Sequence, residues 1–83
     1  MGPLVEMSYT SAAHAEPITG MVYLAISVSN GCGYCIASHG AAARKAGMDE
    51  AMFGELMAVV GMANETNRLA YGYRVPVDAA FEW

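Results

Sequence analysis

The sequence is poor in charge, and poorest in basic residues. Only 14% of its 83 residues are charged, and the four basic ones, Arg44, Lys45, Arg68 and Arg74, form neither a run nor a stripe. A clustered basic patch is the usual footprint of phosphate-backbone binding. The sequence therefore predicts no nucleic-acid partner.

Long apolar runs and abundant cysteine are also missing. The longest apolar stretch, around residues 21–28, is too short to span a bilayer. No basic segment followed by an apolar core marks a secretory signal, so we expect no membrane association and a cytoplasmic location. In that reducing compartment, two cysteines three positions apart are more often catalytic or metal-binding than a structural disulfide.

Apolar residues, by contrast, are plentiful, at 55% of the chain. A domain this short buries a smaller fraction of its surface than a larger one does, and soluble monomers expose little contiguous apolar surface. The excess predicts a subunit interface and hence a homo-oligomer. The alternative is that Ala and Met raise the count without forming a patch.

The chain divides into a predicted N-terminal arm, residues 1–16, which has no sustained periodicity, and an all-α domain, residues 17–83. Pro17 suits the first turn of a helix, and residues 18–29 are apolar on nearly every side, as in a helix buried in a core or between subunits. Their β-branched residues leave a strand as the alternative. Gly31 is a natural left-handed end to this element.

Two further helices are predicted. The first runs from about Cys32 to Ala46, and the second starts at the N-cap Asp49. The second carries an apolar stripe at helical spacing that then turns polar, so that either the helix leaves the core or the polar side chains line a pocket. The stripe consists of Phe53, Leu56, Met57 and Val60, and its polar continuation of Asn64, Asn67 and Tyr71.

After Arg74, residues 75–78 break the helix. The tail that follows ends in two aromatic residues, Phe81 and Trp83. We expect them to dock on this subunit or on a neighbouring one.

Cys32, Cys35 and His39 carry the chemistry that the sequence suggests. A helix turns by about 100° per residue, so Cys35 lies about 60° from Cys32 around the helix axis, and His39 lies about 20° from Cys32. His39 also lies within reach of the Cys35 sulfur, one turn away. Cys32 lies at a helix start, where backbone N–H groups favour a thiolate and lower the pKa of the thiol. The pattern predicts a nucleophilic thiolate, a second thiol that closes a reversible disulfide, and a proton carrier.

Other interpretations compete with a dithiol site. Zinc could use Cys32, Cys35, His39 and a fourth ligand such as His14, although structural zinc sites usually place ligand pairs on separate elements. Haem attachment is excluded, because Ile36 occupies the place of the required histidine. The cysteines could also be inert core residues. We expect neither a metal nor a cofactor.

A family resemblance extends over residues 17–74. It is carried by the segments LAISVSNGCGYCIASHGAAARKAGMDEAMFGELMAVV and NETNRLAYGY, with Asn30-Gly31-Cys32, a Cys-x-x-Cys-x-x-x-His pattern and a break at Gly47 before an acidic helix start. These residues resemble the AhpD-like alkylhydroperoxidase branch of the carboxymuconolactone decarboxylase family. The resemblance implies an all-α fold assembled as homo-oligomers, often hexamers built as trimers of dimers.

The same resemblance implies a thiol-dependent peroxidase or disulfide reductase. Cys35 would attack a hydroperoxide, Cys32 would resolve the sulfenic acid into a disulfide and meet a dithiol electron-donor protein, and His39 would relay protons. Decarboxylation is disfavoured, because the decarboxylase branch lacks the cysteine pair.

The chain departs from that branch at two positions. Gly20 stands where AhpD proteins carry a relay glutamate, with Glu16 one turn earlier, and Tyr34 stands where some members have histidine. If proton transfer limits the reaction, we expect Gly20→Glu to raise turnover, unless Gly20 is packed against another helix. The alternative function is a non-enzymatic helical oligomer that binds a small ligand or partner, or a redox sensor.

Overall fold

The structure, a computed structural model, describes residues 17–83 as a series of helices. Helix α2 spans Pro17–Asn30, α3 spans Gly33–Lys45 and α4 spans Glu50–Gly72, and the short 3-10 helix η2 spans Ala79–Phe81. No strand occurs within residues 17–83, so the all-α prediction is confirmed and the strand alternative for residues 18–29 is wrong. The predicted arm, including His14 and Glu16, lies outside the described residues.

Each helix begins or ends where a particular residue allows it. Gly31 has a φ of 69°, a left-handed conformation that favours glycine, and its N–H donates to the Val28 carbonyl to close α2. At the start of α4, the Asp49 carboxylate accepts a hydrogen bond from the Met52 N–H at 2.8 Å. This is the N-cap that the sequence predicts.

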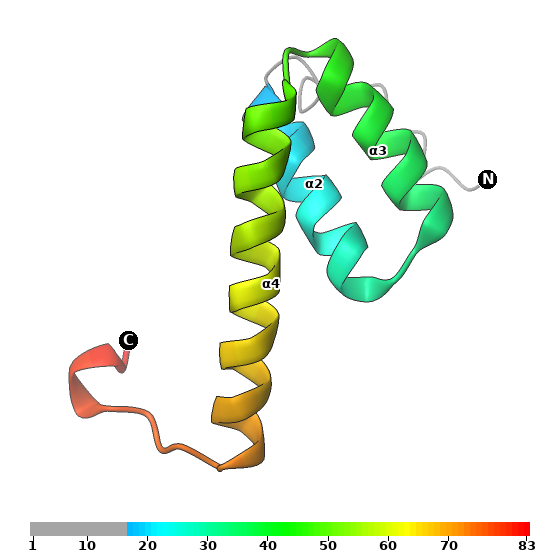
Figure 1. The fold of residues 1–83 in the computed structure, drawn as a ribbon. Coiled ribbons are helices and arrows are strands. Elements are labelled where there is room, and N and C mark those ends of the chain that lie inside the picture. The colour runs from blue at the N-terminus through cyan, green and yellow to red at the C-terminus, as the bar shows by residue number, and fades with distance from the viewer. Residues whose placement is uncertain (1–16) are drawn as a thin grey trace.

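Helices α2 and α3 form an antiparallel hairpin, and α4 runs along α2 (Figure 1). Leu24, Ala43 and Met48 form the buried centre where these helices meet. Gly20 allows a close approach there, because a β-carbon built on it would lie 3.2 Å from the Cα and Cβ atoms of Ala43. This contact sets how α2 lies against the helix that carries the cysteines.

The second half of α4 leaves the core and extends past the hairpin (Figure 1). The Asn64 amide donates to the Ser29 hydroxyl at 2.9 Å and to the Val60 carbonyl at 2.8 Å, whereas Asn67 and Tyr71 are exposed. The polar stripe therefore marks the point at which the helix emerges from the core.

The tail and one apolar face of α2 are exposed to solvent in the described chain. Phe81 and Trp83 are exposed, so the tail does not dock on the described part of its own subunit. Ile18, Val22 and Ile26, spaced four residues apart along α2, are also exposed. Within residues 17–83, no helix has both the length and the apolar character needed to cross a membrane.

Candidate functional site

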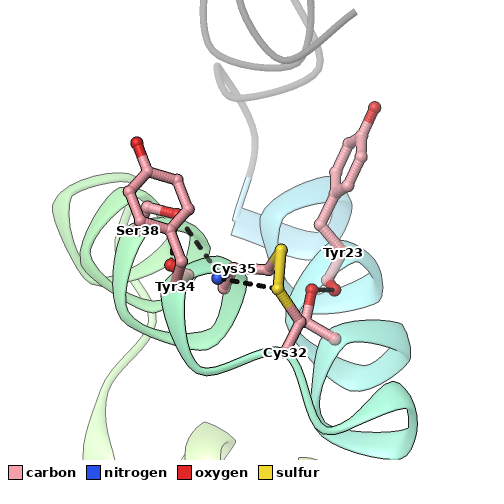
Figure 2. Close-up of a disulfide and its surroundings, with 6 residues drawn as sticks. Tyr23, Cys32, Tyr34, Cys35 and Ser38 are labelled. Carbon is pink, nitrogen blue, oxygen red and sulfur yellow. Dashed lines mark hydrogen bonds between the residues drawn. A yellow bond between two sulfur atoms is a disulfide. The ribbon is translucent and has the colours of Figure 1, made fainter. Parts of the chain in front are cut away.

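A disulfide joins Cys32 and Cys35 at the start of α3, beside the turn that follows α2 (Figure 2). Their Cα atoms are 5.2 Å apart, and both residues are half-buried. The two cysteines are therefore neither core residues nor fully exposed, and they are held at the first turn of a helix.

Cys32 is also the N-cap of α3. Its backbone is extended, and its Sγ accepts a hydrogen bond from the Cys35 N–H at 3.3 Å. An N–H at a helix start favours negative charge on the atom it faces. The structure therefore places a backbone N–H of the helix start beside the Cys32 sulfur.

His39 lies on α3 one turn beyond Cys35 and is buried, with only 6% of its surface exposed. Its ring stacks on the Tyr23 ring of α2, with centroids 4.6 Å apart and planes 8° from parallel. The structure thus places Cys35 and His39 on α3 and Cys32 at the N-cap of that helix, and it adds Tyr23 from a second helix. The sequence offered no direct signal for Tyr23, which is one of several large residues on a helix that is apolar nearly all round.

Two tyrosines border the disulfide. In Figure 2 the Tyr23 side chain extends from α2 and the Tyr34 side chain from α3, on two sides of the sulfur pair. Tyr34 is exposed, and its carbonyl accepts a hydrogen bond from the Ser38 hydroxyl at 2.8 Å. An aromatic border of this kind gives an incoming apolar group a surface to contact.

The zinc alternative finds no support in the described part of the chain. Residues 17–83 contain no group of three or more His, Cys, Asp or Glu side chains that could hold a metal ion. The fourth ligand considered from the sequence, His14, lies outside this part, and so does Glu16, the alternative relay acid.

A separate hollow of about 370 Å³ opens on a different face of α3. Arg44 borders it, with its guanidinium 5.3 Å from the centre of the Phe53 ring and paired with the Glu50 carboxylate. Neither cysteine of the disulfide lines this hollow, and His39 does not line it either. The disulfide and His39 therefore lie apart from this hollow.

Comparison with known proteins shows the family to which the chain belongs. A comparison with curated proteins gives no match. Among solved structures, the chain is similar to the alkylhydroperoxidase AhpD core from Rhodospirillum rubrum ATCC 11170, with a TM-score of 0.76 and 46% sequence identity over 78% of this chain. The match covers 48% of that protein, so this chain spans about half of its length. The model of the carboxymuconolactone decarboxylase family matches residues 19–78, which include the disulfide, His39 and all of α3 and α4, and the chain therefore belongs to the carboxymuconolactone decarboxylase family.

Proposed function

We propose that this protein is a thiol-dependent peroxidase or disulfide reductase in which Cys35 attacks the substrate, Cys32 resolves the product and His39 transfers the protons. The observation that carries the proposal is the Cys32–Cys35 disulfide on the first turn of the helix that buries His39 one turn later. The 46% identity to a protein described as an alkylhydroperoxidase supports a hydroperoxide as the substrate.

The reaction starts from the reduced protein. His39 accepts the proton of the Cys35 thiol, and the thiolate attacks the terminal oxygen of the hydroperoxide. The O–O bond breaks, the alkoxide leaves with the proton from His39 as an alcohol, and Cys35 becomes a sulfenic acid. Cys32 then attacks the Cys35 sulfur, water leaves, and the disulfide forms.

A dithiol donor completes the cycle. One donor thiolate attacks Cys32, the S–S bond breaks, and Cys35 leaves with the electron pair and takes a proton. The second donor thiol then displaces Cys32, so that the donor becomes the disulfide and both protein thiols return. The partner is therefore a dithiol electron-donor protein in the reducing cytoplasm.

We also infer a homo-oligomer, a trimer or hexamer, because the exposed apolar stripe of α2 (Ile18, Val22 and Ile26) has no cover in the described chain. The alternative function is a redox sensor or a ligand-binding helical oligomer without turnover. Gly20 favours this alternative, because it supplies no carboxylate to the histidine.

Peroxide consumption by the reduced protein tests the proposal. With one equivalent of hydroperoxide and no donor, both thiols should be lost together and the mass should fall by two hydrogens. Cys32→Ser should still consume one equivalent and hold a sulfenic acid at Cys35, whereas Cys35→Ser should consume none. His39→Ala should slow the first step by roughly 10²–10⁴-fold.

Each alternative gives a different result. Consumption by Cys35→Ser but not by Cys32→Ser would reverse the roles of the two cysteines. Rapid disulfide formation without turnover, for a panel of hydroperoxides and dithiol donors, would indicate a redox sensor. No thiol loss at all would leave a binding function.

A further inference from the structure

We propose that Tyr23 is the residue that positions His39 for proton transfer, by holding the imidazole plane against its own ring. This inference rests on the proposed function, because it assigns a role within the same thiol site. Tyr23 itself transfers no proton and does not react.

The carrying observation is a tertiary contact between two helices. Tyr23 comes from α2 and His39 from α3, and their rings lie 4.6 Å apart and 8° from parallel. Because His39 is buried, this contact is made inside the fold, where a large aromatic ring is a rigid neighbour.

The geometry limits how the imidazole can turn. The terminal torsion of a histidine side chain is broad, since staggered wells do not hold it. When a second ring lies parallel to the imidazole, rotation about that torsion drives an imidazole edge into the face of the neighbour. Tyr23 therefore fixes the plane in which the two ring nitrogens of His39 lie.

The place of Tyr23 in α2 explains why an aromatic ring serves this purpose here. Gly20, one turn earlier on the same face, has no side chain, and its backbone lies against Ala43. Tyr23 also borders the disulfide in Figure 2, so one side chain contacts the histidine and flanks the sulfurs. Helix α2 therefore positions His39 through the face of the Tyr23 ring.

The test separates the ring from the hydroxyl. Tyr23→Phe keeps the ring, whereas Tyr23→Leu removes it; Tyr23→Met is a second non-aromatic variant if Tyr23→Leu does not fold. Tyr71→Leu is the matched control, because it makes the same change at a position that is 85% exposed near the end of α4. Far-ultraviolet circular dichroism and size-exclusion chromatography confirm that each variant is folded and assembled.

Two readouts are made on the full chain. The first is the nuclear magnetic resonance signal of the His39 ring protons, identified by their loss in His39→Ala. Stacking moves these signals upfield, and we expect the shift to persist in Tyr23→Phe and Tyr71→Leu and to vanish in Tyr23→Leu. The second readout is the rate at which dithiothreitol reduces the disulfide, which needs no peroxidase activity.

We expect Tyr23→Leu to slow this reduction about tenfold, a part of the roughly 10²–10⁴-fold that general acid–base help supplies. Tyr23→Phe should remain within about twofold of the wild type, since it keeps the ring that limits the torsion. In a His39→Ala background, Tyr23→Leu should have no further effect, because a positioning residue acts through the group it positions.

The proposal would be overturned if Tyr23→Leu slowed disulfide reduction equally with and without His39. It would also be overturned if Tyr23→Leu lost the ring-proton shift of His39 but kept the wild-type rate of disulfide reduction. Slow disulfide reduction in Tyr23→Phe would also contradict the proposal, because it would show that the Tyr23 hydroxyl acts directly. Failure of the proposed function is a separate outcome: the wild type would reduce no hydroperoxide, while the ring-proton and dithiothreitol measurements would still decide the role of Tyr23.

Discussion

Gly20 of α2 lies directly against Ala43 of α3, so that a β-carbon on Gly20 would lie 3.2 Å from the Cα and Cβ atoms of Ala43. Ala43 is completely buried, so it cannot move aside into solvent. The smallest residue therefore occupies a close contact between the two helices that frame the disulfide.

Gly20→Ala should therefore destabilise the protein although alanine is the better helix former. Overpacking costs about 1–3 kcal/mol, while the gain in helix propensity is about 1 kcal/mol, so we expect a net loss of roughly 1 kcal/mol in the free energy of unfolding, measured by chemical denaturation. Gly54→Ala is the control, because its β-carbon would meet open space on α4 and the variant should gain stability. A Gly20→Ala protein more stable than the wild type would contradict the close contact.

The same contact changes the expectation for Gly20→Glu. A carboxylate at position 20 would offer His39 a charged partner, but it must first widen the crossing at Ala43. We expect a lower melting temperature than for Gly20→Ala, and increased turnover only where the assembled fold survives. Thermal unfolding and steady-state peroxide consumption of the same sample separate the two effects.

Cys32 should stabilise α3 even when no disulfide is present, since its sulfur caps the Cys35 N–H. In Cys32→Ser a hydroxyl replaces the capping sulfur, whereas Cys32→Ala removes the acceptor. Both variants lack the disulfide, so under reducing conditions their difference reports the cap alone. We expect Cys32→Ala to unfold about 1 kcal/mol more easily than Cys32→Ser. Equal denaturation midpoints of the two variants would show that this capping hydrogen bond contributes nothing to stability.

Arg74→Gly should stabilise the end of α4. Arg74 has a φ of 53° and is the non-glycine residue in the described part that adopts a left-handed conformation. Relieving that strain is worth about 1 kcal/mol, or a rise of about 4–8 °C in the melting temperature of a domain this small. Arg68→Gly removes the same charge within the helix and should instead lower the melting temperature, because glycine is unfavourable there.

Assembly should depend on the exposed apolar stripe of α2. Val22 is 55% exposed between Ile18 and Ile26, so Val22→Glu places a charge in the middle of the stripe. If this stripe is a subunit interface, light scattering should show an oligomer for the wild type and a smaller species for Val22→Glu. Val77→Glu makes the same substitution in the exposed tail, outside the helices, and tests whether added charge alone changes the mass. A wild-type monomer at micromolar concentration would refute the interface.

The helices themselves could be predicted because their boundaries are encoded locally. Pro17, Gly31 and Asp49 each specify a backbone conformation without reference to the rest of the chain. The position of His39 one turn after Cys35 follows in the same way, from helix geometry alone, whereas Cys32 is the extended N-cap and lies outside the helical repeat.

The contacts between helices could not be read from the chain in this way. The Gly20–Ala43 approach and the Tyr23–His39 stack both depend on how α2 is rotated against α3. That rotation results from the packing of all the side chains between the two helices, and no single residue in the chain signals it. The left-handed Arg74 was missed for a different reason, because a glycine would normally mark such a position.

The disulfide spans a sequence separation of only three residues. A crosslink that closes so short a loop restricts the unfolded chain little, by about 2 kcal/mol in the chain-entropy model, and this value grows with loop length. Opening the bond therefore costs less stability than opening a crosslink between distant residues would, and the N-cap of α3 and the Tyr23–His39 stack are contacts separate from the S–S bond. Under the proposed function, the protein would exchange two electrons at this bond in every cycle while its fold stays the same. The disulfide would then serve as a store of oxidising equivalents and hardly as a brace.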